Sequence, residues 1–494
     1  MPVANTALGA LQGLTDQGVA VFRGVPYAQP PVGALRFAEP APAVPWAGTR
    51  DATKHGPIAP QTPSRLAPAM GDYTLPMSED CLTLTIWTPA PDAAKRPVLV
   101  WLHGGAWVSG AGSLDWYDGA RLAHEGGMVV VGVNYRLGAL GYLKHPALPA
   151  DDLGTLDQIE ALRWVAAHIA AFGGDPGCVT VMGQSAGAAS IARLIIDPRA
   201  RPLMHRAILQ SGGFGRDPLT RAEAQATHAE ILRAAGVDPE APDFLAHLRA
   251  VAANALLAAT GKVAQAKARF AETNPPFMPT VAAPMTQAEL FAAIATAAKG
   301  MQVLIGATHD EIHAFFASNP AMANPDWTAS AQRFAALGKR VDAMERYKAR
   351  RPGGSLMDWL ADIVCDHTFL WPTMRLASAL ADAGVPVQAF QFDWAPPGGD
   401  GGSRFRACHC IELPFVFGNF AQWPGAGMLQ GGDAAEMDGL SDAMRAAWCA
   451  FVHRGDAATP ALPWPRYDTA RRATMVLDAC CEVVGDPAGL ETRV

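Results

Sequence analysis

Short runs of apolar residues recur along the chain, and stretches with helical periodicity separate them. Apolar residues over 155–171 mark one face of a helix, which Gly173 and Gly174 stop. Strands that alternate with helices predict an α/β fold with a mostly parallel central sheet flanked by helices. The apolar runs, which are typical of buried strands, lie at residues 82–87, 98–102, 128–133, 179–182, 207–209, 303–305 and 387–392.

Other stretches depart from this rhythm. About the first sixty residues are rich in Pro and Gly, with alternating runs such as 19–22, which predicts a small β-rich region. Ala-rich helical patterns dominate about 220–300 and 325–384, where we expect helical insertions that cap the sheet and shape a pocket. Residues 395–403 are typical of a loop, and the pattern on both sides of it is the same. We therefore expect one large domain over residues 1–494.

The composition is that of a globular chain. Of 494 residues, 50% are hydrophobic and 17% are charged, which favours a soluble fold with a large core. The formal net charge of -7 does not favour binding to nucleic acid or to anionic membranes. We find no apolar run of about eighteen residues, so we expect no membrane span, and the start of the chain lacks a secretory signal pattern.

The number and spacing of the cysteines indicate the cellular compartment in which the protein is expected to work. The eight cysteines are sparse for this length and follow no regular spacing. We expect them to be reduced and mostly buried, which is typical of a cytoplasmic protein. They are Cys81, Cys178, Cys365, Cys408, Cys410, Cys449, Cys480 and Cys481.

The strongest chemical signal is a Gly-x-Ser-x-Gly sequence at residues 183–187, with Ser185 at its centre. An apolar run precedes it and a helical pattern follows it, which predicts a strand, a tight turn and a helix. The two glycines leave room for a sharp turn, so the serine projects from its apex at the N-terminus of a helix. This arrangement suits a nucleophile beside which negative charge develops.

Such a nucleophile needs N–H donors for the oxyanion that its reaction forms. The backbone N–H of Ala186, directly after the serine, can supply one donor. A second set is expected from a Gly-rich turn after an earlier strand, and Gly104 and Gly105 follow the run at 98–102. The alternative is that these glycines form an ordinary turn without a catalytic role. Because the chain also has the serine turn, this alternative is the weaker explanation.

The nucleophile also needs a base, and the chain has thirteen histidines. His103 belongs to the Gly-rich turn and is expected to brace it, while a packed or solvated role is expected for His168. His409 lies in a loop after a late strand, where α/β enzymes present a base, although its position also fits a buried structural histidine. The orienting acid is expected between serine and histidine, where Asp310 and Glu311 follow a strand and spacing does not choose between them.

Two metal-site readings of these residues are weak. His309 and His313 are four residues apart, but Glu311 between them would lie on the far side of a helix, and Asp310 holds the usual base position. Cys408 and Cys410 flank His409, but in an extended segment they point to the opposite face. We expect neither a metal ion nor an organic cofactor.

Together these motifs resemble those of the type-B carboxylesterase and cholinesterase family of α/β-hydrolases. The combination is highly specific although each part is weak alone, and it runs through most of the chain. In family order, the matching stretches are residues 22–31, 78–84, 103–105, 134–136, 172–176, 183–187 and 205–212.

The resemblance implies a role for each site residue. The family's acid matches Glu311 and its base matches His409, which completes a triad with Ser185. Its oxyanion donors match the N–H groups of Gly105, Ala106 and Ala186, and an auxiliary serine of the family matches Ser211.

The chain departs from the family pattern at three places. Ile312 stands where the family usually has glycine after the acid, and Gln184 stands where many members have glutamate, which weakens the case for a cationic substrate. Cys81 has no cysteine upstream of it, so the disulfide of many secreted relatives cannot form. We therefore expect a bacterial, cytoplasmic member.

The resemblance implies a serine hydrolase that cleaves carboxylic esters through an acyl-enzyme. We expect a small-molecule substrate, a small or medium apolar or aromatic ester, while the oligomeric state is not readable. Cleavage of amide, carbamate or thioester bonds is an alternative, and a non-catalytic binding protein on the same fold is a weaker one. Candidates to line an apolar pocket, or simply to pack in the core, are Trp107, Trp116, Phe315, Phe316, Trp359, Phe369 and Trp371.

Overall fold

A single large sheet runs through the molecule. The computed structural model describes residues 1–338, 342–397 and 404–490. Most of the predicted loop at 395–403 therefore lies outside the described residues. Within them, the sheet has eleven strands, and from one edge to the other these are β14 (Glu482–Gly485), β13 (Ala473–Leu477), β12 (Val387–Phe392), β11 (Gln302–Thr308), β10 (Arg206–Gln210), β9 (Gly174–Gln184), β7 (Arg96–Leu102), β8 (Val129–Val133), β6 (Thr83–Thr88), β4 (Val19–Pro26) and β3 (Leu14–Asp16).

The centre of this sheet is parallel and its edges are antiparallel. From β13 to β8 each strand pairs in parallel with its neighbour, whereas β6, β4 and β3 at one edge and β14 at the other pair antiparallel. All seven apolar runs that the sequence indicates as strands are strands of this sheet. The predicted α/β architecture is thereby confirmed.

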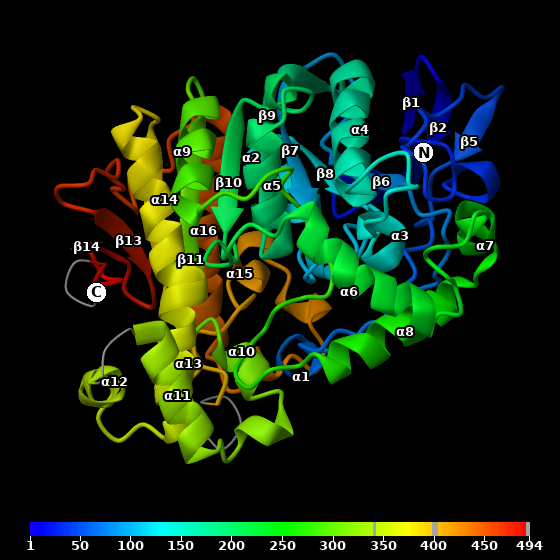
Figure 1. Ribbon diagram of the computed structural model, residues 1–494. Coiled ribbons are helices and arrows are strands. Elements are labelled where there is room, and N and C mark those ends of the chain that lie inside the picture. The colour runs from blue at the N-terminus through cyan, green and yellow to red at the C-terminus, as the bar shows by residue number, and fades with distance from the viewer. Residues whose placement is uncertain (339–341, 398–403, 491–494) are drawn as a thin grey trace.

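The β-rich region predicted near the N-terminus is also present. The strands β1 (Val3–Thr6), β2 (Gly9–Gln12) and β5 (Thr49–Asp51) form a separate small sheet. Figure 1 shows it beside α4 at one end of the molecule.

Successive side chains along the central strands belong alternately to two separate core clusters. In β7, Val98, Val100 and Leu102 belong to one cluster, whereas Leu99 and Trp101 belong to the other. Because successive side chains of a strand point to opposite faces, each cluster covers one face of the sheet. Strands buried on both faces are read as continuous apolar runs, which explains why they were recognisable in the sequence.

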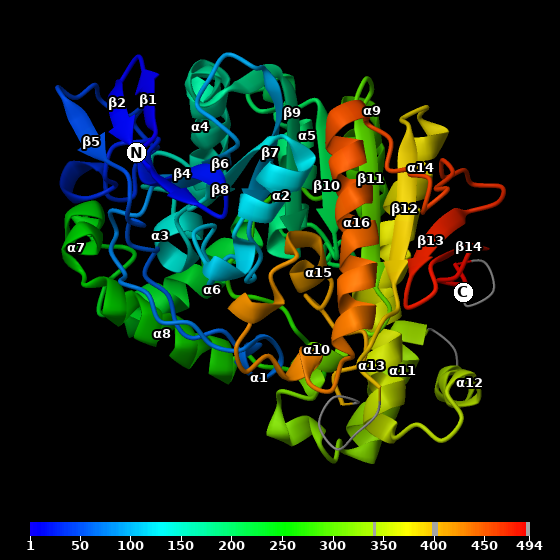
Figure 2. The same cartoon turned by 180° about the vertical axis from the view of Figure 1, so that it is seen from behind.

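Helices cover both faces. The helices α4 (Leu153–His168), α5 (Ala186–Ile196), α9 (Gln287–Ala297) and α14 (Trp371–Asp382) contribute to the first cluster, and lie on the near side in Figure 1. On the opposite face, α2 (Ala120–Gly126) and α16 (Ala434–Arg454) contribute to the second cluster and are nearer the viewer in Figure 2. The helix predicted over 155–171 is α4 followed by a 3₁₀ turn, and Gly173, at φ 79°, ends it.

The remaining helices lie mostly beyond the carboxyl ends of the parallel strands (Figure 1). Within 220–300 and 325–384, α14 packs on β11 and β12 of the sheet, and α9 packs against α5 and α14. The others are α6 (Arg221–Ala234), α7 (Phe244–Ala250), α8 (Ala253–Ala266), α11 (Trp327–Gly338), α12 (Ala343–Arg350) and α13 (Leu356–Cys365), together with the short α1 (Ala67–Met70), α3 (Gly138–Tyr142), α10 (His313–Phe316) and α15 (Leu413–Phe417).

Short helical turns complete the described chain. A π-helical turn, η6 (Asp366–Leu370), joins α13 to α14. The 3₁₀ turns are η1 (Gly33–Leu35), η2 (Asp115–Tyr117), η3 (Ile169–Phe172), η4 (Arg201–Leu203), η5 (Pro320–Met322), η7 (Phe420–Gln422) and η8 (Gly427–Leu429). Among the described helices, none is by itself long and apolar enough to cross a membrane; α7 and α8, bent by 102°, meet the length and composition test only as a pair.

Candidate active site

Ser185 lies in a strained turn between β9 and α5. Its backbone has φ 56° and ψ −120°, a conformation that non-glycine residues rarely adopt. Two hydrogen bonds hold the turn: the Ser185 N–H donates to the carbonyl of Gln210 at 2.9 Å, and the Ser185 carbonyl accepts from the N–H of Ala189 at 3.0 Å. The serine is half-buried, so its side chain stays accessible at the N-terminus of the helix.

The turn requires its two glycines because a side chain would not fit at either position, and not because of their backbone dihedral angles. Neither Gly183 nor Gly187 has a positive φ. A Cβ on Gly187 would lie 2.0 Å from the carbonyl oxygen of Leu102, and one on Gly183 would lie 2.6 Å from the carbonyl carbon of Gly187. The glycines therefore let β7, β9 and α5 approach one another closely.

The Gly-rich turn after β7 faces the serine. A Cβ on Gly104 would lie 3.1 Å from the Cβ of Ser185, which shows how near the two turns are. Gly105 and Ala106 both have positive φ, 106° and 55°. Ala186 is the first residue of α5, so its N–H has no partner within the helix. In the described part of the chain, no acceptor is paired with the N–H of Gly105, Ala106 or Ala186.

His103 braces this turn, as the sequence predicts. Its Nδ1 lies 2.7 Å from the carbonyl oxygen of Gly104, and its ring stacks on Tyr135 with centroids 4.3 Å apart. Burial lowers the pKa of His103 to about 4, so the ring is neutral and Nδ1–H donates to that carbonyl.

Ser211 directly follows β10, next to the serine turn. It is fully buried with φ 51°, and its N–H donates to the carbonyl of Gly306 at 2.8 Å. Its Oγ has no hydrogen-bond partner among the described residues. A buried hydroxyl without a partner is costly and calls for a functional explanation.

His409 and Glu311 form a buried pair. Nδ1 of His409 contacts the Oε2 of Glu311, and the exposed fractions of the two side chains are 1% and 0%. The other carboxylate oxygen accepts the N–H of Thr308 at 3.0 Å, which fixes its orientation at the end of β11. Of the two neighbouring acids that spacing left open, the structure thus brings Glu311 to the histidine.

The opposite edge of the imidazole faces the serine turn. Nε2 of His409 lies 3.2 Å from Nε2 of Gln184, the residue before Ser185. With Nδ1–H donated to Glu311, the neutral ring presents Nε2 as an acceptor, which is the tautomer that a general base needs. The imidazole therefore spans the space between the acid and the turn that carries the serine.

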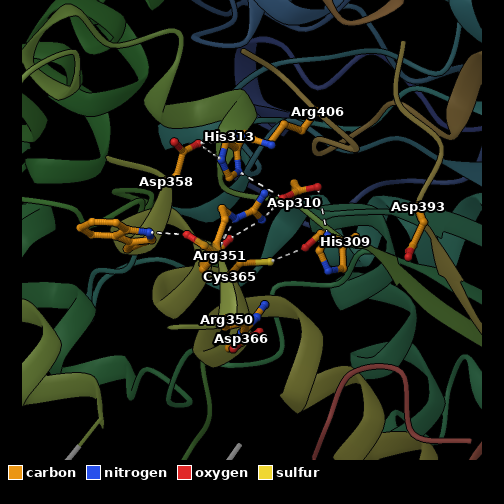
Figure 3. A network of polar contacts seen from close by, with 12 residues as sticks. His309, Asp310, His313, Arg350, Arg351, Asp358, Cys365, Asp366, Asp393 and Arg406 are labelled. Atoms are coloured by element: carbon orange, nitrogen blue, oxygen red, sulfur yellow. Dashed lines mark hydrogen bonds and ion pairs between the residues drawn. The ribbon is translucent and has the colours of Figure 1, made fainter. Parts of the chain in front are cut away.

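Asp310 belongs to a different network, drawn in Figure 3. Arg351 donates to Asp310 at 2.5 Å and to Asp362 at 2.7 and 2.8 Å. The carboxylate of Asp310 also contacts Nδ1 of His309 at 3.1 Å. Although burial by itself would raise it, the pKa of Asp310 lies far below its ordinary range because of His309, His313 and Arg351.

The same network extends to the loop that precedes His409. Asp358 on α13 accepts from Arg406 at 3.0 and 3.2 Å and contacts Nε2 of His313 at 3.1 Å. Side-chain atoms of Asp310, His313 and Asp362 that could ligate a metal lie within 4.8 Å of one another. The cation that bridges the two aspartates is the guanidinium of Arg351, and Glu311 turns away to His409. The arrangement is therefore an ion-pair network that fastens α13 to the loops of the acid and the base.

Cys408 and Cys410, on either side of His409, are buried free thiols. Burial raises the pKa of both well above the ordinary value for cysteine, so they stay protonated. They pack as small apolar side chains in the second core cluster.

Of the seven aromatic candidates for the pocket, two contact the candidate base. The rings of Phe315 and Phe369 lie 5.3 and 5.0 Å from the ring of His409, centroid to centroid. Trp107 instead donates to Ser190 at 2.9 Å, and Trp116 stacks on Trp423 in the core. Phe316 and Trp371 are buried in the first core cluster, against which the half-buried Trp359 packs.

Sequence reasoning missed one buried acid of the site. Glu412 is fully buried, with one carboxylate oxygen 3.1 Å from the amide of Gln210 and the other without a described partner. Burial, with the nearby charge of Glu311, raises the pKa of Glu412 to about 8. Its position three residues after His409 gave no sign that tertiary packing would bury it.

A parallel sheet, a serine in a strained strand-to-helix turn, and a histidine held by a carboxylate from a later strand define the α/β-hydrolase class. The comparisons with known proteins agree. The family model described as "Carboxylesterase family" matches residues 1–482.

Two curated relatives are similar over nearly their whole length. Phenmedipham hydrolase of Pseudarthrobacter oxydans is 38% identical over 99% of this chain and 97% of its own. Para-nitrobenzyl esterase of Bacillus subtilis is 36% identical over 98% of this chain and 96% of its own. A solved thermophilic para-nitrobenzyl esterase has a TM-score of 0.86 and 34% identity, with 100% of this chain and 99% of the other covered. The chain belongs to the carboxylesterase family and is a carboxylic ester hydrolase.

Proposed function

We propose that the protein hydrolyses esters through an acyl-enzyme, with Ser185 as nucleophile, His409 as base and Glu311 as the orienting acid. The observation that carries this proposal is the buried imidazole, which contacts Glu311 through Nδ1 and faces the serine turn through Nε2. A serine hydroxyl is a weak nucleophile unless a base takes its proton as it attacks.

In the first half of the reaction, Ser185 attacks the ester carbonyl while His409 takes its proton. Glu311 holds the ring in the correct tautomer and stabilises the imidazolium. The N–H groups of Gly105, Ala106 and Ala186 donate to the oxyanion, a role supported by their lack of a described acceptor. His409 then protonates the leaving alcohol, and in the second half it activates the water that releases the acid. We assign Ser211 an auxiliary role next to the nucleophile, supported by its buried hydroxyl without a described partner.

We propose a small or medium apolar or aromatic ester as substrate. Phe315 and Phe369 beside the imidazole support this class, because an apolar wall removes water from a bound acyl or alcohol group. We propose that the protein works in the cytoplasm of a bacterium. Its described cysteines are all free thiols, which suits a reducing compartment, and the curated relatives named above are bacterial.

The test of the nucleophile is Ser185→Ala, measured as kcat/KM on para-nitrophenyl butyrate. We expect a loss of roughly 10⁶-fold, because the attacking oxygen is absent while the rest of the site stays in place. Ser378→Ala, on α14, is the matched control and should retain full activity, because its hydroxyl contacts only Met374 and Tyr467 among the described residues. A Ser185→Ala enzyme that keeps near-native turnover would refute the triad assignment.

A fluorophosphonate probe gives an independent readout. Labelling at Ser185 is expected in the native protein and should be lost in Ser185→Ala, whereas a protein that only binds ligands would remain unlabelled. A panel of matched amides, carbamates and thioesters then decides whether esters are the preferred bond.

A further inference from the structure

Two arginines lie beside the phenylalanines that pack on the candidate base. The guanidinium of Arg65 is 4.9 Å from the ring centroid of Phe315, and that of Arg216 is 6.0 Å from that of Phe369. Since both rings contact His409, one aromatic ring separates each guanidinium from the imidazole. Arg65 follows the N-terminal β region and Arg216 follows β10, so the fold brings the two together from distant parts of the chain.

A single carbonyl group holds the pair in place. The carbonyl oxygen of Thr273 accepts from Arg65 at 3.0 Å and from Arg216 at 3.2 Å. Arg216 also donates to the hydroxyl of Thr273 and, through Nε, to the side-chain oxygen of Asn274, both at 3.2 Å. A Cβ on Gly213 would lie 2.2 Å from Nη1 of Arg216, so the guanidinium crosses the backbone just after Ser211. The pair is thus fixed at the edge of the candidate active site.

These two cations have no acidic partner within ion-pair distance in the described part of the chain. By contrast, Arg350, Arg351 and Arg406 nearby all contact aspartates. Burial and the adjacent charge of Arg65 lower the pKa of Arg216 to about 10, so it remains protonated at neutral pH. Two like charges side by side repel each other, and an anion between them would relieve that repulsion.

Several donors of the pair remain free for such an anion. Among the described residues, Nη1 of Arg216 and the Nε and Nη1 of Arg65 have no hydrogen-bond acceptor. Arg216 is half-buried and Arg65 is exposed, so a ligand can reach both. Guanidinium groups bind carboxylates through paired, charge-assisted hydrogen bonds.

We propose that Arg65 and Arg216 form a subsite for a carboxylate carried by the ester substrate. The inference rests on the proposed function and narrows its substrate class to apolar or aromatic esters with a free carboxylate, whose apolar part lies against Phe315 and Phe369. The pair binds the substrate and takes no part in bond breaking.

The test compares kcat/KM for esters that differ only in this carboxylate. One pair, para-acetoxybenzoate and its methyl ester, places the charge on the leaving group; the other, mono-para-nitrophenyl adipate and its methyl ester, places it on the acyl group. In at least one pair we expect the native enzyme to prefer the free acid. Arg65→Gln and Arg216→Gln should each lower kcat/KM for that acid by about 10- to 100-fold, mostly through KM, with the methyl ester changed by less than about 3-fold.

Arg50→Gln is the matched control, since Arg50 also lies over an aromatic ring, 5.6 Å from Trp46, but in the small sheet. Arg50→Gln should change kcat/KM neither for the free acid nor for the methyl ester. Arg216→Lys should restore part of the preference, because it keeps the charge and loses the paired geometry. Equal losses for acid and methyl ester in the glutamine variants, or a native preference for the methyl ester in both pairs, would overturn the subsite.

The two proposals fail in different ways. Hydrolysis of the free acids that does not depend on Arg65 or Arg216 removes the subsite and leaves the proposed function intact. No hydrolysis of these esters or of para-nitrophenyl butyrate by the native enzyme would overturn both.

Discussion

At the scale of single residues, the site depends on glycines, which have no side chain and so leave room for the backbone, as much as on reactive groups. Gly187 lets α5 come within contact of the Leu102 carbonyl, and Ser185 adopts a positive φ that the packing around it enforces. Strain of this kind persists only where the surrounding structure imposes it, and it commonly marks functional positions. The local sequence indicates such a turn because glycine spacing and flanking periodicity are local properties.

Glu412 yields a prediction on stability against pH. Burial raises its pKa from 4.5 to about 8 in the folded protein, so the folded state holds a proton that the unfolded chain releases between these values. The folded state then binds more protons, and the free energy of unfolding falls as pH rises through that window, by at most about 1.4 kcal/mol per pH unit.

Glu412→Gln, which is isosteric and cannot ionise, should remove this contribution. We expect the loss of unfolding free energy between pH 5 and pH 8, measured by urea denaturation, to be smaller in the variant than in the native protein. Comparison of the two proteins cancels the titration of all other groups. Equal losses in both would show that Glu412 is not held protonated.

At the scale of elements, the ion-pair network of Figure 3 decides how the insertion is attached. Arg351 follows α12, Asp362 lies on α13, and Asp310 precedes the candidate acid in the loop after β11. Asp358 on α13 adds a link to Arg406, three residues before His409. Because the network joins both loops of the acid–base pair to one helix, its loss should disturb the site as well as the fold.

Arg351→Met tests this link. It leaves Asp310 and Asp362, with side-chain exposures of 8% and 3%, without their shared cation. We expect a loss of about 3–5 kcal/mol in the free energy of unfolding, because breaking a buried ion pair leaves an unpaired charge behind. Urea denaturation measures this loss, and kcat/KM should fall in the same variant.

Lys267→Ala is the control for Arg351→Met. Lys267 pairs with Glu230 at 2.8 Å on the surface, where both side chains are nearly half exposed. Exposed pairs contribute little, so we expect a change below about 1 kcal/mol. Similar losses for Lys267→Ala and Arg351→Met would contradict the special role of the network.

At the scale of the whole molecule, we propose that the chain is one cooperative domain. The central sheet takes β3 from near the N-terminus and β14 from near the C-terminus as its opposite edges. One core cluster includes residues from Ala4 to Leu490. Because the sheet and this cluster extend along almost the entire chain, no part can unfold without exposing apolar surface of the rest.

Calorimetry tests the single domain. We expect one transition, with a calorimetric enthalpy close to the van't Hoff enthalpy, and equal midpoints for tryptophan fluorescence and far-UV circular dichroism. Two separated transitions, or midpoints that differ between the probes, would show that the chain contains independently folding units.

The sequence by itself determined the order of strands and helices, the N-terminal β region and the strand–turn–helix around Ser185. These features depend on periodicity and on glycine spacing, which neighbouring residues set. Spacing did not choose between Asp310 and Glu311, and only the family resemblance selected Glu311.

Only the tertiary structure decided which side chains meet. Glu311 reaches His409 while Asp310, one residue earlier, pairs with Arg351, because successive residues of the loop face opposite sides. Glu412 becomes buried, and Arg65 and Arg216 converge on the carbonyl of Thr273. Such contacts join residues far apart in the chain, and their geometry follows from the packing of whole elements, which no local pattern encodes.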